Sequence, residues 1–466
     1  MILNIGLFLQ RIKLFRKQFI FMSKDIVVNN GLDLKLVGVA AKKIITPKID
    51  LDYSIFPSDF HGVFPKLIVK ENDIVKAGEI IFYDKNSEKV KFASPVSGKI
   101  VNILRGERRK VLEIKIKADK SNKFKNLSNK NLNQSNNVIE FMLESGLWVF
   151  VKQRPYDIIA DPDIKPRDIY ISGFDSSPLA ADYDFITKDS EEKIIEAINQ
   201  LSKLTDGIIN ITLRPDSKSF LRKLKNVKIH NIVGPHPAGN LSTIINKTSP
   251  INKGDVVWTL NLPDLSIIGN AFLNGKFEAE RIIAVAGSSV SKPTYLKTLI
   301  GSKVSSYIEL NSVNSRVVSG NILTGKQINS DGNLRYYNNE ITAIPEGNDY
   351  DLFGWAKPMF SKFSISRALT FSWLFPDKAY DLNTNTNGEH RAFVVTGSFE
   401  KVFPLNIYPL QILKACMYKD LDEMEALGMY EVSPEDFALT EFICVSKQPH
   451  QEIIRNGLDL MKKEIG

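Results

Sequence analysis

One stretch of the chain, residues 227–239, constrains the fold more than any other. It begins as an alternating apolar run over 227–233, which predicts a β-strand. The run stops in Gly234-Pro-His-Pro-Ala-Gly239. There two prolines fix φ and remove backbone donors, while two glycines permit positive φ. We therefore expect a strand that ends in a rigid, shaped loop.

The residues before this strand alternate between strand and helix patterns. Apolar runs at 168–173 and 207–213 predict strands, and the segments 190–204 and 217–224 predict helices. This order favours an open α/β sheet, in which ligands and partners meet the carboxyl ends of the strands. No G-x-G-x-x-G follows the first strand and no phosphate-binding P-loop motif occurs, so we expect no dinucleotide site of the usual kind.

Length and composition indicate a multidomain globular protein. The chain has 466 residues, of which 43% are hydrophobic and 24% charged. No run approaches the roughly 18 consecutive apolar residues of a membrane helix, so we expect no transmembrane segment. The two cysteines, Cys416 and Cys444, are too few for a four-thiolate cluster and have no zinc-site spacing. We therefore predict no metal site in this chain, and the sequence singles out no catalytic residue.

The net charge of +8 is concentrated locally. Met1–Phe21 holds four basic residues and no acid, and Val101–Lys130 holds ten basic and three acidic residues. One end of the molecule is therefore suited to bind an anionic membrane surface or an acidic partner. The alternative is that these basic residues lie in a solvated tail and a solvated loop and bind nothing. No aromatic-interleaved basic face accompanies the charge, so nucleic acid is not an expected partner.

Two hairpin patterns mark the N-terminal region. Residues 66–82 and 90–103 each alternate strand residues around glycine-containing turns. They resemble the barrel-sandwich hybrid of biotinyl and lipoyl carrier domains. Asp84-Lys85 is superficially like the modified-lysine tip of those domains, but the segment from this tip to Pro95 is longer than in carriers. We therefore expect Lys85 to be a solvated residue of a surface turn.

The later patterns complete a multidomain α/β protein. A strand at 255–260, a helix at 262–273 and glycine-punctuated strands after Pro293 predict a β-grasp module of the SLBB type, and the tail is helical with a cap at Ser433-Pro-Glu-Asp436. We expect the chain to begin with an extension at 1–21 that is disordered or not part of the natural start. The expected domains after it are a barrel-sandwich hybrid at 22–125, a Rossmann-like α/β domain at 137–254 and a β-grasp module at 255–335. A β-rich connecting segment at 336–402 and a helical C-terminal domain at 403–466 complete the chain.

Several motifs together carry a family resemblance over nearly the whole chain after Met22. They are Gly31-Leu-Asp-Leu34, Ser94-Pro-Val-Ser-Gly98, Arg105-Gly-Glu-Arg108, the loop 234–239, Val257-Trp-Thr259, Arg316–Gly325, Ile344-Pro-Glu-Gly347, Glu435–Leu439 and Gly457–Met461. In this order they resemble the A subunit of the sodium-translocating NADH:quinone reductase (Na⁺-NQR) family.

This resemblance implies a peripheral subunit on the cytoplasmic face of the bacterial inner membrane, assembled with five other subunits (B, C, D, E and F). The complex of the family oxidises NADH, reduces ubiquinone and exports Na⁺. Its flavins (FAD, FMN and riboflavin) and its iron–sulfur centre belong to the other subunits, which implies no cofactor in this chain. The fold also resembles the flavin-bearing subunit of complex I, whose helical tail carries a cluster.

The resemblance also implies a place for ubiquinone. A quinone needs an apolar slot and one or two polar groups for its carbonyl oxygens. The candidate contact residues are Gly31, Leu32, Gly234, Pro235, His236, Pro237, Ala238 and Gly239. His236 suits a hydrogen bond or proton transfer to the quinone, whereas the alternative role for the same loop is to lock the α/β domain to its neighbour.

The remaining histidines are expected to be structural or solvated. His230 alternates with apolar neighbours and is expected to be a core or edge histidine, while His61, His390 and His450 are expected at the surface.

The main interpretation is that this chain is a subunit that assembles the complex and forms or shields its quinone-reducing end, and that it is not catalytic by itself. Two alternatives stay open, a flavin-binding NADH-dehydrogenase-type subunit akin to the complex I protein, and a lipoyl or biotinyl carrier.

Overall fold

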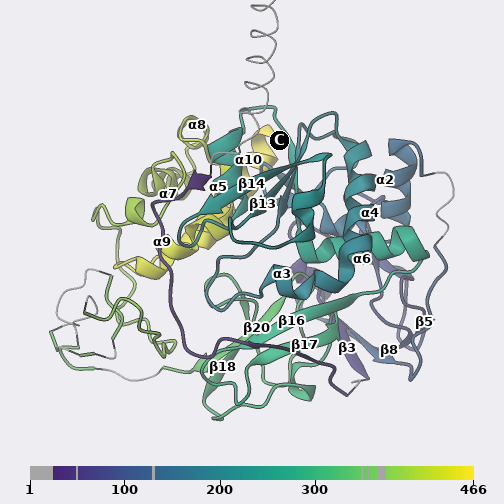
Figure 1. Cartoon of the computed structure of the whole chain (residues 1–466), viewed down its shortest axis with the longest axis horizontal. Helices are drawn as coiled ribbons and strands as arrows, with labels where there is room; N and C mark the ends of the chain where they lie inside the picture. Colours follow the sequence, from purple (N-terminus) through teal and green to yellow (C-terminus); the bar gives the residue numbers. More distant parts are fainter. Residues whose placement is uncertain are drawn as a thin grey trace, which may run out of the picture.

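The computed structural model describes residues 25–48, 51–127, 132–347, 351–354, 356–357, 359–360, 362–365 and 374–466. The expected extension 1–21 lies outside these residues. The described strands form four sheets, with helices packed around the largest one (Figure 1). Within this described part of the chain, no helix combines the length and apolar character that a membrane crossing requires.

The largest sheet is the predicted α/β sheet. Its seven strands lie in the order β1 (Ile26–Val27), β14 (Val227–Val233), β13 (Ile209–Leu213), β12 (Ile169–Ser172), β15 (Val257–Asn261), β10 (Lys152–Arg154) and β11 (Ile158–Ile159). The first five are parallel, β10 is antiparallel to β15, and β11 is antiparallel to β10. Strands β12 and β13 are buried along their whole length, as expected for parallel strands with both faces covered.

Helices cover this sheet on both faces. They are α2 (Ser135–Glu144), α3 (Tyr183–Ile186), α4 (Glu191–Leu201), α5 (Leu241–Thr248) and α6 (Leu262–Asn274). Helix α6 has Pro263 in its first turn and ends at Gly275 with φ 61°, the left-handed residue that commonly closes a helix. The helix expected at 217–224 is only a short 3₁₀ turn, Phe220–Lys223.

The second-largest sheet is the β-grasp module. Its order is β19 (Lys326–Ile328), β18 (Ser315–Ser319), β20 (Glu340–Pro345), β16 (Glu280–Ala286), β17 (Thr294–Leu299) and β2 (Ala41–Ile45). Figure 1 shows its labelled strands below the α/β sheet, with β3, β5 and β8 at their side.

Two smaller sheets form the barrel-sandwich hybrid. One has β3 (Asp52–Ile55), β9 (Val111–Ala118), β8 (Gly98–Arg105) and β5 (Ile74–Val75), and the other has β4 (Pro65–Leu67), β6 (Ile80–Asp84) and β7 (Lys91–Ala93). Phe82 and Phe92 stack in its core with ring centroids 4.3 Å apart. One continuous apolar core joins this hybrid to the α/β sheet and the β-grasp module.

The helical tail packs on one face of the α/β sheet. Its helices are α7 (Pro409–Tyr418), α8 (Leu421–Ala426), α9 (Ala438–Ile443) and α10 (His450–Ile465). Ile232 and Ile244 of the α/β domain share a buried cluster with Leu413, Phe437 and Leu458 of the tail. The predicted cap before α9 is confirmed, since the amide and hydroxyl of Ser433 both donate to Asp436 Oδ2 at 2.8 Å.

Sheet pairing corrects the expected domain boundaries. Strand β1 joins the α/β sheet and β2 joins the β-grasp sheet, so the hybrid begins later than residue 22. Strand β15 and helix α6 belong to the α/β domain, which moves its end beyond 254. In 336–402, β20 completes the β-grasp sheet, and the described residues after it contain no further strand, only a single bridge between Leu36 and Tyr380.

Candidate functional site

Two candidate segments far apart in the sequence meet at one edge of the α/β sheet. Strands β1 and β14 are parallel neighbours, with Ile26 opposite Ile232 and Val27 opposite Val233. Because parallel strands end at the same edge, the chain leaving β1 and the chain leaving β14 emerge side by side. The Gly31 segment (Gly31–Asp33) therefore lies against the His236 loop (Gly234–Gly239).

Backbone hydrogen bonds join these two segments. The Leu32 amide donates to the His236 carbonyl oxygen at 2.8 Å, and the His236 amide donates to Asp33 Oδ1 at 2.8 Å. A Cβ atom at position 31 would lie 2.3 Å from the His236 carbonyl oxygen. This close approach requires glycine at position 31.

The ends of β12 and β13 hold the other side of the loop. Ser176 Oγ lies 3.0 Å from His236 Nδ1 and accepts a hydrogen bond of 2.8 Å from the Gly239 amide. Arg214 Nη1, after β13, donates to the Gly234 carbonyl oxygen at 2.7 Å. Four parallel strands thus contribute residues to one junction, as the carboxyl-edge rule predicts.

The His236 side chain is buried and only half satisfied. It is 4% exposed, and its Nε2 has no hydrogen-bond partner within the described ranges. Burial lowers the pKa of His236, although Asp175, Asp33 and Asp436 oppose this shift, so the imidazole is neutral near pH 7. Since Ser176 Oγ already accepts from Gly239, its own proton is available to Nδ1. That arrangement favours Nε2–H, a buried donor that lacks an acceptor.

The short 3₁₀ helix Phe399–Lys401 and the helical tail that follows it close the junction from a third side. The Gly31 amide donates to the Lys401 carbonyl oxygen at 3.0 Å, and Asn30 Nδ2 donates to the Glu400 carbonyl oxygen at 2.9 Å. Asn240 Nδ2, just after the loop, donates to Asp436 Oδ1 at 3.3 Å. The loop therefore links the N-terminal segment, the α/β sheet and the tail.

The candidate residues differ in their access to solvent. His236, Pro237, Ala238 and Gly239 are buried, whereas Gly31, Leu32, Gly234 and Pro235 are half-buried. Sequence reasoning missed Asp33, Ser176, Arg214 and Asp436 as members of this junction. The one available signal was that Ser176 follows shortly after the predicted strand at 168–173. This position places Ser176 at the carboxyl edge of the sheet, where the candidate loop 234–239 was also expected.

A second part of the carboxyl edge, between β12 and β15, is covered by the β-grasp module. The Ala181 amide, in the connection after β12, donates to Glu340 Oε2 at 3.2 Å. Asp264, in the first turn of α6, pairs with Arg281 of β16 at 2.5 Å. The strand order changes direction here, and open α/β sheets usually bind nucleotides at such a point. Burial raises the pKa of Glu340 well above its usual range, so the β-grasp module places a buried, neutral carboxyl group in this crevice.

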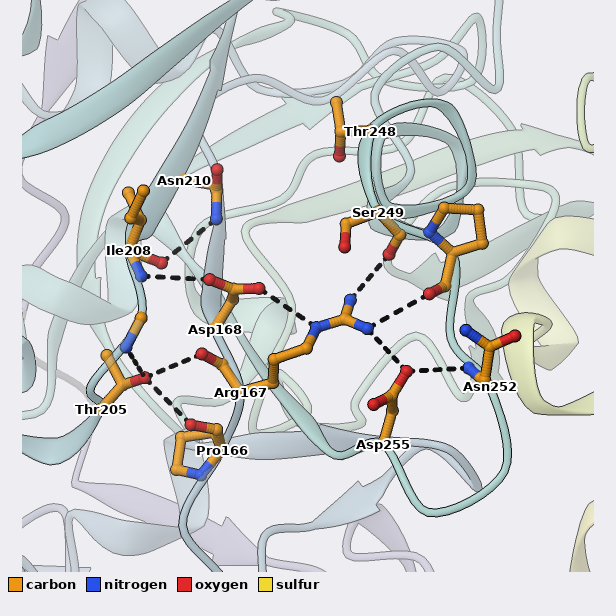
Figure 2. A network of polar contacts seen from close by, with 12 residues as sticks. Pro166, Arg167, Asp168, Thr205, Ile208, Asn210, Thr248, Ser249, Asn252 and Asp255 are labelled. Atoms are coloured by element: carbon orange, nitrogen blue, oxygen red, sulfur yellow. Dashed lines mark hydrogen bonds and ion pairs between the residues drawn. The ribbon is translucent and has the colours of Figure 1, made fainter.

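The opposite, amino-terminal edge of the sheet is fastened by Arg167 (Figure 2). Its guanidinium donates to Asp255 Oδ2 at 2.7 Å, to the Ser249 carbonyl oxygen at 2.7 Å and to Asp168 Oδ2 at 3.2 Å. Asp168 Oδ1 in turn accepts from the Ile208 amide at 3.0 Å. This network ties together the starts of β12, β13 and β15, away from the His236 loop.

The four other histidines differ in their burial. His230 is buried with Nε2 2.9 Å from Asn210 Oδ1, which confirms a core histidine. His61 and His390 are exposed, as expected, and His61 Nε2 lies 2.7 Å from Asp459 Oδ1. His450 was expected at the surface but is fully buried, because it begins α10 beneath the rings of Phe393 and Phe399.

Lys85 and the cysteines also have clear positions. Lys85 is exposed just after β6, in agreement with a surface turn. Cys416 and Cys444 are both free and buried, and burial raises the pKa of the Cys416 thiol to about 12. The Cys416 thiol is therefore a poor ligand and nucleophile, because both roles need the thiolate.

Comparison with known proteins agrees with this architecture. Family models match residues 26–119 as the NqrA N-terminal barrel-sandwich hybrid domain, 133–277 as the NqrA second alpha/beta domain and 282–330 as the NQRA C-terminal domain. The second range includes β15 and α6, as the sheet pairing does.

Full-length relatives are similar over almost the whole chain. The A subunit of the Na(+)-translocating NADH-quinone reductase of Neisseria meningitidis serogroup B is 33% identical over 452 residues, covering 94% of this chain and 100% of the relative. The corresponding proteins of Haemophilus influenzae (strain PittGG) and Marinomonas sp. are 34% and 33% identical, over 94% of this chain and 100% and 99% of their own lengths. This chain therefore belongs to the NqrA family, the A subunits of the Na(+)-translocating NADH-quinone reductases.

Proposed function

We propose that this chain is a peripheral subunit that assembles on the cytoplasmic face of the bacterial inner membrane with the five other subunits, B, C, D, E and F. The named activity of its relatives, NADH oxidation coupled to quinone reduction and Na⁺ translocation, belongs to the whole complex. Within it, the chain helps to form or shield the end where ubiquinone is reduced. The single observation that carries this role is the junction at His236, which combines a buried, unpartnered donor with half-buried apolar neighbours.

The electron carriers are proposed to lie in the partner subunits. These carriers are the flavins FAD, FMN and riboflavin and an iron–sulfur centre. Two features of this chain support that assignment. The crevice where α/β sheets usually bind a nucleotide is covered by the β-grasp module, whose buried Glu340 side chain accepts a hydrogen bond from the Ala181 amide there. The thiols of Cys416 and Cys444 are buried, and the Cys416 thiol resists deprotonation.

The quinone contact is proposed at the junction of the Gly31 segment and the His236 loop. The contact residues are Gly31, Leu32, Gly234, Pro235, His236, Pro237, Ala238 and Gly239. Leu32 and Pro235 are half-buried, so they offer apolar surface to a ring or an isoprenoid tail. A neutral His236 with a proton on Nε2 offers a hydrogen bond to a carbonyl oxygen, once the loop gives the quinone access.

Assembly and quinone contact are tested by two separate measurements. Assembly predicts that the tagged chain co-purifies with the five other subunits from detergent-solubilised membranes, and recovery of the chain alone would contradict it. Quinone contact predicts that His236→Gln or Leu32→Ala raises KM for ubiquinone about tenfold in the purified complex, the cost of about one neutral hydrogen bond or one truncated apolar contact. KM for NADH should stay constant.

The matched control for these variants is Arg167→Ala, which weakens the same domain at the opposite edge of the sheet. It should leave the ubiquinone KM unchanged in complexes that assemble. Equal KM values for wild type, His236→Gln and Leu32→Ala would rule out the quinone contact and leave the His236 loop with a structural role.

A further inference from the structure

The turn between β8 and β9 carries a dense positive charge at the end of a long hairpin. Arg105, Arg108, Arg109 and Lys110 lie within six residues, with Glu107 as the one acid among them. The turn is closed by the Gly106 amide, which donates to the Lys110 carbonyl oxygen at 2.8 Å. All of these charged side chains are exposed. We call residues 104–112 the basic tip.

The backbone of the basic tip is strained. Arg108 and Arg109 have φ angles of 51° and 60°, so two consecutive non-glycine residues adopt the left-handed conformation. This conformation is unfavourable for residues with a side chain, and proteins retain it mainly where a local shape is needed for function. Within the turn, Arg105 Nη1 donates a hydrogen bond to the Arg109 carbonyl oxygen at 3.2 Å.

Two leucines frame the cations and are themselves exposed. Leu104 is 46% exposed and Leu112 is 40% exposed. Leu112 lies across the turn, since a Cβ atom at Gly106 would be 3.0 Å from its Cδ1. Two acids near the tip have other partners: Glu113 accepts from Ser54 Oγ at 2.7 Å and lies 3.7 Å from Lys115 Nζ, and Glu71 Oε1 accepts from the Ile103 amide at 2.9 Å. The tip therefore presents cations beside aliphatic side chains, with little local neutralisation.

We propose that the basic tip binds the anionic phosphate headgroups of a lipid bilayer. Guanidinium groups form forked hydrogen bonds with phosphate oxygens, which suits three arginines in one turn. The flanking leucines favour a lipid surface over an acidic protein, because basic residues beside exposed aliphatic ones are typical of segments that enter the membrane interface. This inference rests on the proposed membrane-bound location and adds which face of the chain meets the lipid.

The test uses the purified full chain and sedimentation with large unilamellar vesicles. Vesicles of phosphatidylcholine with about 30% phosphatidylglycerol should bind the chain, and pure phosphatidylcholine vesicles should bind it far less. The variant Arg108→Gln/Arg109→Gln/Lys110→Gln should bind the anionic vesicles about 100-fold more weakly, because each basic residue near such a surface contributes about a factor of five. Leu104→Ala/Leu112→Ala should also weaken binding.

The matched control removes the same charge elsewhere. Lys218→Gln/Lys223→Gln/Lys225→Gln changes three exposed lysines of the α/β domain and should reduce binding only slightly. Every variant keeps the segment Met1–Phe21, so any contribution from it is common to all. Equal losses in the two triple variants, or equal binding to neutral and anionic vesicles, would overturn the lipid site.

Co-purification separates this inference from the proposed function. A tip variant that binds vesicles normally but no longer co-purifies with the other subunits would place a protein, not lipid, on the tip. A tip variant that loses vesicle binding and still co-purifies supports the lipid site. Failure of the wild-type chain to co-purify would contradict the proposed assembly, whatever the vesicles show.

Discussion

The amide of Leu32 donates a hydrogen bond to the carbonyl oxygen of His236 at 2.8 Å. This one bond joins a segment near the start of the chain to a loop in the middle of the α/β domain. Its consequence is that two sets of candidate residues, selected separately from the sequence, form a single junction. The short 3₁₀ helix Phe399–Lys401, just before the helical tail, completes this junction, because the Lys401 carbonyl oxygen accepts from the Gly31 amide.

We expect Gly31→Ala to destabilise the protein by about 1–3 kcal/mol, because the new methyl group would collide with the His236 carbonyl oxygen. Urea unfolding of the purified chain measures this change. Gly62→Ala is the control, since Gly62 also has positive φ, 75°, but no heavy atom within 4 Å of the added carbon. It should cost about 1 kcal/mol from backbone strain alone. Equal losses for the two variants would show that the contact with His236 is unimportant.

The buried pair Asp264–Arg281, which joins α6 to the β-grasp sheet, should show strong coupling. Either Asp264→Leu or Arg281→Met alone should cost about 3–5 kcal/mol, because it leaves one uncompensated buried charge. The double variant should recover most of that loss. Burial raises the pKa of Asp264 even though Arg281 opposes the shift, which indicates that desolvation offsets much of the attraction. Additive losses in a double-mutant cycle would contradict this interpretation.

His450 should make stability fall in mild acid. Thr440 Oγ1 donates to the Phe437 carbonyl oxygen, so it accepts from His450 Nδ1–H at 2.9 Å and leaves Nε2 unprotonated and buried. Burial lowers the pKa of His450 to about 4. The unfolded chain, with a histidine pKa of about 6.5, therefore binds a proton first, and about 3 kcal/mol of stability is lost as pH falls from 6.5 to 4.

The variant His450→Gln should flatten this part of the stability profile, measured by urea unfolding at a series of pH values. His230 contributes in the same direction, because burial also lowers its pKa to about 4. His390→Gln, at an exposed position, should leave the profile unchanged. A wild-type slope that persists in His450→Gln would show that other groups cause the acid sensitivity.

Arg167→Ala should destabilise the α/β domain by about 2–3 kcal/mol, because it removes several hydrogen bonds to charged and carbonyl oxygens at the amino-terminal edge of the sheet (Figure 2). Lys165→Ala removes a neighbouring ion pair with Asp206 that is largely exposed, and should change stability by less than about 0.5 kcal/mol. Thermal unfolding of both variants provides the comparison. Similar melting temperatures for the two would contradict the role of Arg167.

Local patterns correctly predicted strands β12, β13, β14 and β15, the longer helices and the shaped loop. The apolar alternation before Gly234 became β14, and the cap at Ser433 became the start of the turn before α9. Both signals act within a few residues, which is the range over which side-chain periodicity and capping are decided. The family resemblance supplied the order of the domains.

Long-range pairing was not predictable from those patterns. Strand β1 is only Ile26–Val27, too short to show periodicity, yet it pairs with β14 and so brings Gly31 to His236. The expected end of the α/β domain at residue 254 differs from the sheet pairing for the same reason. The sequence of β15 predicts a strand, but only its hydrogen bonds to β12 assign that strand to the α/β sheet. His450 was expected at the surface because the sequence shows no partner pattern for it, and its burial depends on Phe393 and Phe399 from an earlier segment.

If the chain contributes shape and quinone contacts while the electron carriers lie in partner subunits, the purified chain should be redox-inactive. The most direct measurement is its visible absorption spectrum, combined with an assay of NADH oxidation and of flavin released on denaturation. The expected result is a colourless protein that releases no flavin and does not oxidise NADH by itself. A stoichiometric flavin or iron–sulfur chromophore, or NADH turnover by the chain alone, would contradict it.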